Sequence, residues 1–219
     1  MSQGIIIELK GGLGQQLFQY AGGRVMASVL GGTLYLSEPE GKDYRPILFL
    51  KSTPQTPMIS TNVYLQQSPT EPWNPERFRG MRTLFCQGQF QYLNALTPVL
   101  PFLKQELLAS LQPIRQQLIT KYNLQLRKRA AFIYVTRDKP PVYYESVIAN
   151  LTSKKSMHVY ILSDDITWCK TQPWLNGYTV VDEPEMHALA FMSLCEGGSV
   201  PSNPLSWWGS FLAGAQSVI

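Results

Sequence analysis

Histidine and cysteine are scarce in this sequence, and each scarcity argues against a class of site. The two histidines, His158 and His187, fall at the start of a strand-like segment and in a partly apolar helical one. We expect both to be structural, which disfavours histidine-based metal centres and Ser-His-Asp hydrolysis. The three cysteines are widely spaced and form no Cys-x-x-Cys pair, so zinc sites and disulfide scaffolds are also disfavoured.

Long hydrophobic runs and strong charge are missing too. No apolar run approaches the roughly 18 residues of a membrane span, and no targeting segment is visible, so we expect a cytoplasmic protein without a membrane span. Charged residues make up 16% of the chain and the formal net charge is +4, which helps to attract an anionic ligand but does not indicate nucleic acid. The apolar fraction of 44% is close to that of globular proteins.

Strand-like and helix-like segments alternate along the chain. Residues 5–9 predict a buried strand, and apolar residues at three- and four-residue steps predict a helix over 16–30. A helical pattern over 103–126 precedes a second series that begins with a strand at 130–135. The alternation predicts an α/β protein with largely parallel sheets, in two Rossmann-like lobes over 1–127 and 128–219.

A glycine-rich turn follows the first predicted strand. Gly11, Gly12 and Gly14 let a ligand approach the backbone, and the next helix would present free N–H groups, which together suit a phosphate. A tight turn without a ligand explains the same spacing. The turn matches neither the GxxxxGK[ST] pattern nor GxGxxG.

Polar residues follow two strands of the second series. Arg137 could clamp a diphosphate, with Asp138 orienting it or accepting a proton; a surface ion pair is the alternative. Asp164 and Asp165 could hold a metal, a base or a sugar, whereas Ser163 or Asp164 could instead cap a helix. Near the end of the chain, the start of a predicted helix forms a candidate anion site with Ser202, Asn203 and Ser206, of which Ser206 is the best phosphate ligand.

Five segments together resemble the α-1,2-fucosyltransferases. Residues 11–21, GGLGQQLFQYA, are similar to that family's N-terminal signature, with Gln15 in place of Asn. Residues 88–93, GQFQYL, and 163–168, SDDITW, resemble two further motifs, as do MSLC at 192–195 and LSWWG at 205–209. The family's HxRRGD motif is matched in part: Tyr134 stands at the His position, Thr136 at the first Arg and Arg137 at the second.

The resemblance implies a GT-B type glycosyltransferase that inverts the anomeric carbon. It would transfer L-fucose from GDP-fucose to a glycan hydroxyl, with no metal or other cofactor. The N-terminal lobe would face the acceptor and the C-terminal lobe would hold the sugar nucleotide. A transferase for another sugar nucleotide, or a non-catalytic glycan- or nucleotide-binding protein, is the alternative. Arg137 and Asp138 would be catalytic; the donor-binding residues would be Gly11, Gly12, Gly14, Gln15, Tyr134, Asp164, Asp165, Ser202, Asn203 and Ser206.

Overall fold

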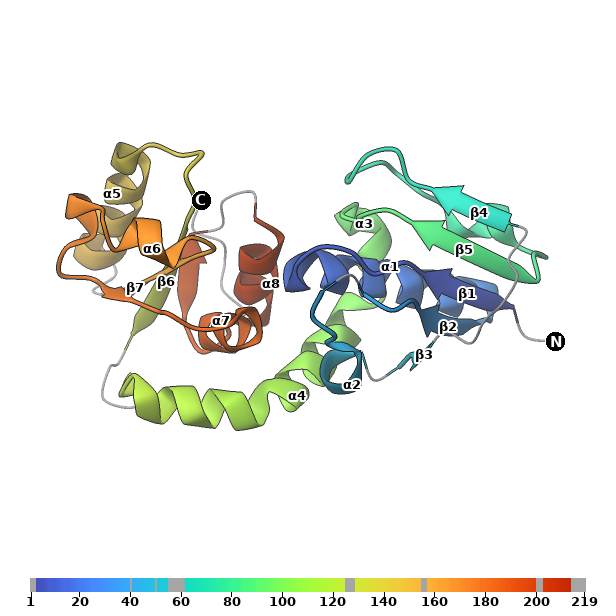
Figure 1. The fold of residues 1–219 in the computed structure, drawn as a ribbon, viewed down its shortest axis with the longest axis horizontal. Helices are drawn as coiled ribbons and strands as arrows, with labels where there is room; N and C mark the ends of the chain where they lie inside the picture. Colours follow the sequence, from blue (N-terminus) through green and yellow to red (C-terminus); the bar gives the residue numbers. More distant parts are fainter. Residues whose placement is uncertain are drawn as a thin grey trace. The chain divides into compact units, whose positions relative to one another are not determined.

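The chain folds as two compact units, each built on one parallel sheet (Figure 1). The computed structural model describes residues 3–39, 41–49, 51–54, 62–124, 129–154, 157–199 and 203–213. The units are Met1–Ser110 and Leu111–Ile219, so their boundary lies inside helix α4 (Leu100–Lys121). The sequence analysis placed the boundary after this helix, between residues 127 and 128. Contacts at both ends of α4 explain this. Glu106 pairs with Arg24 of the first unit, and Lys121 pairs with Glu183 of the second.

The first unit contains a five-stranded sheet whose described pairs are all parallel, in the order β3-β2-β1-β5-β4. Helix α1 (Leu13–Leu30) packs closely on one face, because a Cβ atom at Gly23 would lie within 3 Å of the side chains of Ile7 and Leu34. The strands are β1 (Gly4–Ile7), β2 (Thr33–Leu36), β3 (Thr53–Pro54), β4 (Asn62–Leu65) and β5 (Thr83–Gln87). The shorter elements are α2 (Arg45–Leu48), η1 (Pro75–Phe78) and α3 (Leu93–Leu96).

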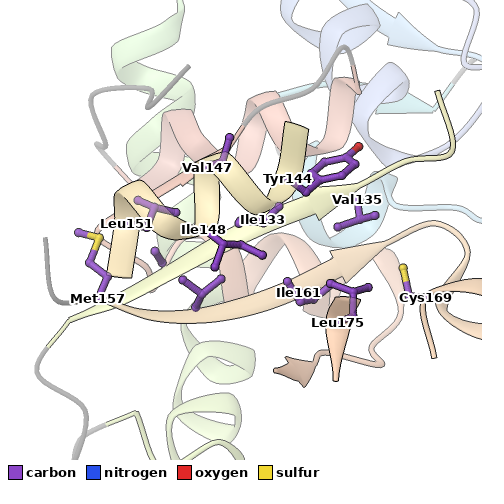
Figure 2. Close-up of a cluster of buried hydrophobic side chains, with 12 residues drawn as sticks. Ile133, Val135, Tyr144, Val147, Ile148, Leu151, Met157, Ile161, Cys169 and Leu175 are labelled. Carbon is purple, nitrogen blue, oxygen red and sulfur yellow. The ribbon is translucent and has the colours of Figure 1, made fainter. Parts of the chain in front are cut away.

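The second unit contains a four-stranded parallel sheet in the order β8-β7-β6-β9. All six residues of β6 (Ala130–Val135) are buried, as expected for a parallel strand that is covered on both faces. Figure 2 shows α5 (Pro141–Ala149) lying over one face, where its side chains pack on Ile133, Val135 and Ile161. On the other face, the ring of Tyr160 lies 4.9 Å from that of Phe191 in α7 (Glu185–Met192).

The remaining elements of the second unit connect these strands. They are β7 (His158–Ser163), β8 (Thr179–Val180), β9 (Gly197–Ser199), α6 (Ile166–Cys169), α8 (Pro204–Ala213), η3 (Asn150–Lys154) and η4 (Pro173–Leu175). Between β7 and β8 the chain forms two short helical pieces, α6 and η4, because Pro173 begins a new turn and cannot continue α6. Among the described residues, no helix is both long enough and apolar enough to cross a membrane.

Candidate functional site

The loops after β6 and β7 meet at the carboxyl edge of the second sheet. The two strands are paired to their last residues, Val135 and Ser163, so the segments that follow them start side by side. Open parallel sheets bind ligands at this edge. It carries Arg137 and Asp138 from one loop and Asp164 and Asp165 from the other, so the sequence-predicted residues of these two loops come together.

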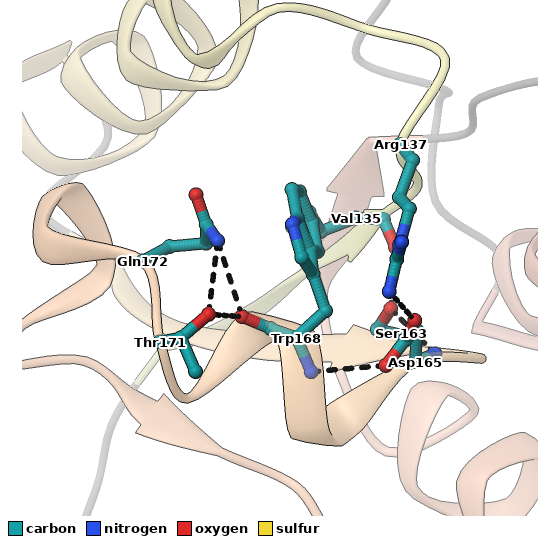
Figure 3. A network of polar contacts seen from close by, with 7 residues as sticks. All are labelled: Val135, Arg137, Ser163, Asp165, Trp168, Thr171 and Gln172. Carbon is teal, nitrogen blue, oxygen red and sulfur yellow. Dashed lines mark hydrogen bonds and ion pairs between the residues drawn. The ribbon is translucent and has the colours of Figure 1, made fainter.

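Arg137 reaches across from the β6 loop to the β7 loop (Figure 3). Its guanidinium forms an ion pair with the carboxylate of Asp165 and lies 5.5 Å from the ring centre of Trp168. The Arg137 side chain is 64% exposed, so its remaining N–H groups are accessible to a ligand. An exposed ion pair contributes little to stability, which makes positioning of the guanidinium the more important consequence of this contact.

Asp165 has two tasks. One carboxylate oxygen accepts the backbone N–H of Trp168 at 2.9 Å and so caps α6, while the other pairs with Arg137. The N–H of Trp168 first, and the guanidinium of Arg137 second, hold the pKa of Asp165 below its usual value. The helix cap anticipated at Ser163 or Asp164 is thus made by Asp165. Asp164 is exposed.

Ser163 joins the two strand ends. Its hydroxyl donates to the carbonyl of Val135 at 2.7 Å and accepts the N–H of Asp165 at 3.0 Å. One short side chain therefore connects the end of β6 to the turn that presents Asp165. The separation between Arg137 and Asp165 is consequently set by the sheet itself.

Tyr144 anchors the loop after β6 through hydrogen bonds to the backbone of Thr136. Its buried hydroxyl accepts the N–H of Thr136 at 2.9 Å and donates to the carbonyl of the same residue at 3.1 Å. The Tyr144 ring stacks on Trp174 with centroids 5.5 Å apart. Burial raises the pKa of Tyr144, so the hydroxyl stays protonated. The Thr136 hydroxyl donates a hydrogen bond to the Asp138 carboxylate. The carboxylate that pairs with Arg137 is that of Asp165.

Tyr134 and Asn203 connect β6 to the start of α8. The Tyr134 hydroxyl is hydrogen-bonded to the Asn203 side chain, and burial first, then the negative charges of Asp164 and Glu185, raise its pKa. The Asn203 Oδ1 accepts the N–H groups of Leu205 and Ser206 at 2.8 and 3.2 Å, so this residue caps α8.

The Ser206 hydroxyl points into the protein. It donates to the carbonyl of Asn203 at 2.9 Å, and the residue is 0% exposed. This geometry disfavours Ser206 as the phosphate ligand. Ser202, predicted for the same anion site, lies outside the described residues.

The glycine turn lies at the carboxyl end of β1 in the first unit. Gly11 has a φ of +78°, in the left-handed region that favours glycine, and Gly12 precedes α1 without a side-chain cap. Both glycines are exposed, Gly14 is buried, and Gln15 is half-buried. The turn thus presents backbone to the surface, and the side chain of Gln15 lies where a Cβ atom on Gly11 would be.

Two buried glutamines of α1 hold this turn in shape. The Gln16 Nε2 donates to the carbonyl of Gly11 at 3.0 Å, and the Gln19 Oε1 accepts the N–H of Lys10 at 3.0 Å. Gln16 and Gln19 are 1% and 4% exposed, which is unusual for glutamine. The presence of Gln16 and Gln19 in the GGLGQQLFQYA segment is therefore explained by their structural role in the turn.

Sequence reasoning missed the roles of Trp168 and Tyr144. Trp168 lies three residues after Asp165, which brings its backbone N–H onto that carboxylate and its ring under Arg137. The spacing of the SDDITW segment could have indicated the capping contact, but the ring contact depends on the neighbouring strand. The role of Tyr144 becomes visible only in the packed structure, where α5 brings its hydroxyl to the backbone of Thr136.

A metal-binding cluster is not found in the part of the chain that the structure describes, where no three His, Cys, Asp or Glu side chains gather in a suitable group. The sequence-based expectation that the reaction needs no metal remains a prediction. Arg137 is a cationic side chain at this edge that could carry a ligand's negative charge.

No protein-family model and no curated protein match the chain. Its structure is similar to several solved structures. The fold is similar to that of solved fucosyltransferase structures. NodZ α-1,6-fucosyltransferase soaked with GDP-fucose matches with a TM-score of 0.62 and 11% identity, over 97% of this chain and 93% of NodZ. A second structure, fucosyltransferase NodZ from Bradyrhizobium, has a TM-score of 0.60 and 11% identity, covering 95% and 93% of the two chains.

Arabidopsis thaliana FUT1, as a mutant in complex with GDP, has a TM-score of 0.59 and 12% identity, with 99% of this chain and 70% of FUT1 covered. At such low identity these similarities establish the fold alone. They confirm the predicted class, α/β with two parallel-sheet, Rossmann-like lobes of the GT-B type.

Proposed function

We propose that this protein is an inverting glycosyltransferase that transfers fucose from GDP-fucose to a hydroxyl group of a glycan, forming an α-1,2 linkage. The observation that carries the proposal is the exposed guanidinium of Arg137, held by Asp165 over Trp168 at the carboxyl edge of the second sheet. The fold supports it, because the structurally similar NodZ and FUT1 were solved with GDP-fucose or GDP.

Arg137 would bind the diphosphate and stabilise its charge as it leaves. One Nη atom is engaged by Asp165, which leaves the other N–H groups for two phosphate oxygens. Because the guanidinium is already positioned, little reorganisation is needed when negative charge develops on the leaving group. In the reaction, the acceptor oxygen forms a bond to the anomeric carbon, the bond from that carbon to the diphosphate breaks, and GDP departs with the electron pair.

The two aspartates of the β7 loop would have different tasks. Both carboxylate oxygens of Asp165 already accept hydrogen bonds, so this residue would position Arg137. Asp164 is exposed beside it and would accept the N–H groups of guanine. Asp138, also exposed, would take the proton of the acceptor hydroxyl with the carboxylate oxygen that does not contact Thr136.

A second candidate function is nucleotide binding without transfer. Thr136 stands where the resembled family has its first arginine, and its hydroxyl is engaged with Asp138 and Tyr144. A site with one cation where the family has two would bind the diphosphate less well and stabilise the leaving group less. This candidate predicts binding of GDP-fucose with neither transfer nor hydrolysis.

Calorimetric titration with GDP and GDP-fucose, each with and without EDTA, tests the proposal, with UDP and UDP-sugars as controls. We expect binding of the guanine compounds alone, and release of GDP from GDP-fucose in the presence of an accepting glycan. Arg129→Ala is the matched control for Arg137→Ala, because Arg129 is an exposed arginine at the opposite end of β6. Equal binding of GDP by the two variants would refute the role of Arg137.

A further inference from the structure

A pocket of about 540 Å³ lies in the first unit, away from the glycine turn. Its lining residues are Arg24, Ala27 and Ser28 from the second half of α1, Gly32, Thr33 and Leu34 at the start of β2, and Lys51, Ser52 and Thr53 around β3. β3 is the edge strand of the sheet and β2 lies next to it (Figure 1). The pocket therefore lies near the amino ends of these strands, whereas Gly11 and Gly12 follow the carboxyl end of β1.

Two of the lining residues are cationic. Arg24 and Lys51 contribute cationic groups, and none of the lining residues is acidic. The Arg24 Nη1 donates to the Tyr20 hydroxyl at 3.1 Å and to the Glu106 carboxylate at 2.8 Å. Within the described ranges, the Nε and Nη2 groups of Arg24 donate to no protein atom. The guanidinium is thus fixed at one nitrogen and available at the other two.

Tyr20 also positions Lys51. Its hydroxyl accepts the backbone N–H of Lys51 at 3.1 Å, so one buried tyrosine holds the segments that carry both cations. The Tyr20 ring also stacks on Phe49, two residues before Lys51, with centroids 4.7 Å apart. This contact holds the chain segment that leads to Lys51. The Arg24 guanidinium and the backbone that carries Lys51 are consequently in place before any ligand binds, and such preorganisation favours affinity.

The neighbouring hydroxyls can only accept hydrogen bonds from a ligand. Ser52 donates its proton to the carbonyl of Phe49 at 2.7 Å, and Thr53 donates its own to the carbonyl of Leu34 at 3.1 Å. Their oxygen lone pairs remain for donors on a ligand. A matching ligand carries an oxyanion for the cations and hydroxyl groups for Ser52 and Thr53.

We propose that this pocket binds a small acidic carbohydrate, with its carboxylate or phosphate on Arg24 and Lys51 and its hydroxyls on Ser52 and Thr53. The volume lies within the range of small-molecule sites. The proposal is independent of the transferase function, since no residue of the pocket belongs to the candidate site of the second unit. A carboxylated sugar and a phosphorylated sugar share the required chemistry, and the test distinguishes them.

The test is a set of titrations in the presence of saturating GDP, using glucuronate, glucose 6-phosphate, neutral glucose and inorganic phosphate. We expect at least one acidic sugar to bind, and to bind more tightly than glucose or inorganic phosphate. Lys51→Glu should weaken that binding by about tenfold or more, because it replaces an attraction with a repulsion. Arg82→Gln removes an exposed positive charge of the same unit outside the pocket and should leave the affinity unchanged.

A second variant guards against misfolding. Arg24→Lys keeps the charge beside Glu106 but loses the planar donor fork, and should also weaken binding. The proposal is overturned if neither acidic sugar binds, if glucose or inorganic phosphate binds equally well, or if both variants bind like the unaltered protein. It is also overturned if GDP competes with the acidic sugar, since that would place the sugar in the nucleotide site.

Discussion

The carboxyl edges of the two sheets offer different chemistry. In the first unit, the turn after β1 presents backbone: Gly11 and Gly12 are exposed, and the polar side chains Gln16 and Gln19 are buried beneath them. In the second unit, the turns after β6 and β7 present charged side chains, with Arg137 and Asp165 paired at the surface. One edge is therefore shaped for close approach of a ligand and the other for recognition of its charge.

The difference shows where each unit tolerates change. A backbone surface depends on φ angles and on the absence of Cβ atoms, so it is sensitive to additions. A side-chain surface depends on particular functional groups and on the hydrogen bonds that hold them, so it is sensitive to removals. Tyr144 and Ser163 make hydrogen bonds of this kind, which hold the loops that carry Arg137 and Asp165. The predictions below test this distinction, from the largest expected effect to the smallest.

Removing the guanidinium should have the largest effect. In Arg137→Ala, turnover of GDP-fucose should fall by about two to three orders of magnitude, because losing one charge-stabilising contact typically costs about 2.7–4 kcal/mol of barrier. Steady-state kinetics against Arg129→Ala measures this. Similar rates in the two variants would contradict the assignment of chemistry to the β6 loop.

Removing the hydroxyl below that loop should have the next largest effect. Tyr144→Phe leaves the N–H and carbonyl of Thr136 without their side-chain partner, at a cost of about 1–3 kcal/mol in the free energy of unfolding. Denaturant unfolding checks this, with Tyr143→Phe as the matched control on the same helix. Transfer activity should fall in Tyr144→Phe and not in Tyr143→Phe. Equal stability of the two variants would show that the loop does not depend on Tyr144.

Adding a methyl group to the glycine turn should destabilise the first unit. Gly11→Ala places a side chain at a φ of +78°, which costs roughly 1–2 kcal/mol, and its Cβ would displace Gln15. Gly31→Ala is the control, because Gly31 also has a positive φ, of +63°, but its Cβ would meet nothing within 4 Å. In thermal unfolding, the melting temperature of Gly11→Ala should be lower than that of Gly31→Ala. The reverse order would show that the glycine turn accommodates the added methyl group at little cost.

The smallest effect is a pH dependence. Because the pKa of Asp165 is lower in the folded protein, its carboxylate stabilises the fold above the unfolded pKa, about 3.9, and this stabilisation is lost as the pH falls through the folded value. Asp165→Asn should therefore be less stable than the unaltered protein at neutral pH, and the difference should disappear in acid. Asp164→Asn, at the exposed neighbour, is the control. A difference that persists unchanged at pH 2 would show that the charge of Asp165 does not cause it.

Local pattern was enough to predict much of this protein. The apolar runs at 5–9 and 130–135 and the helical periodicity at 16–30 predicted β1, β6 and α1, because buried parallel strands and long amphipathic helices have strong signals of their own. The alternation of these elements predicted the fold class. Residues at strand ends, Arg137 and Asp165 among them, were predicted as a site because parallel strands bring their carboxyl ends to one edge.

Partners could not be predicted in the same way. Which aspartate pairs with Arg137, how Trp168 lies beside it, and why Ser206 faces inward depend on contacts between segments that are distant along the chain. The division of the chain inside α4 depends on Glu106 and Lys121 binding to different units. Periodicity reports only whether a residue is buried, whereas the choice of partner is made by the packing of the whole sheet and its helices, and so only the tertiary structure decides it.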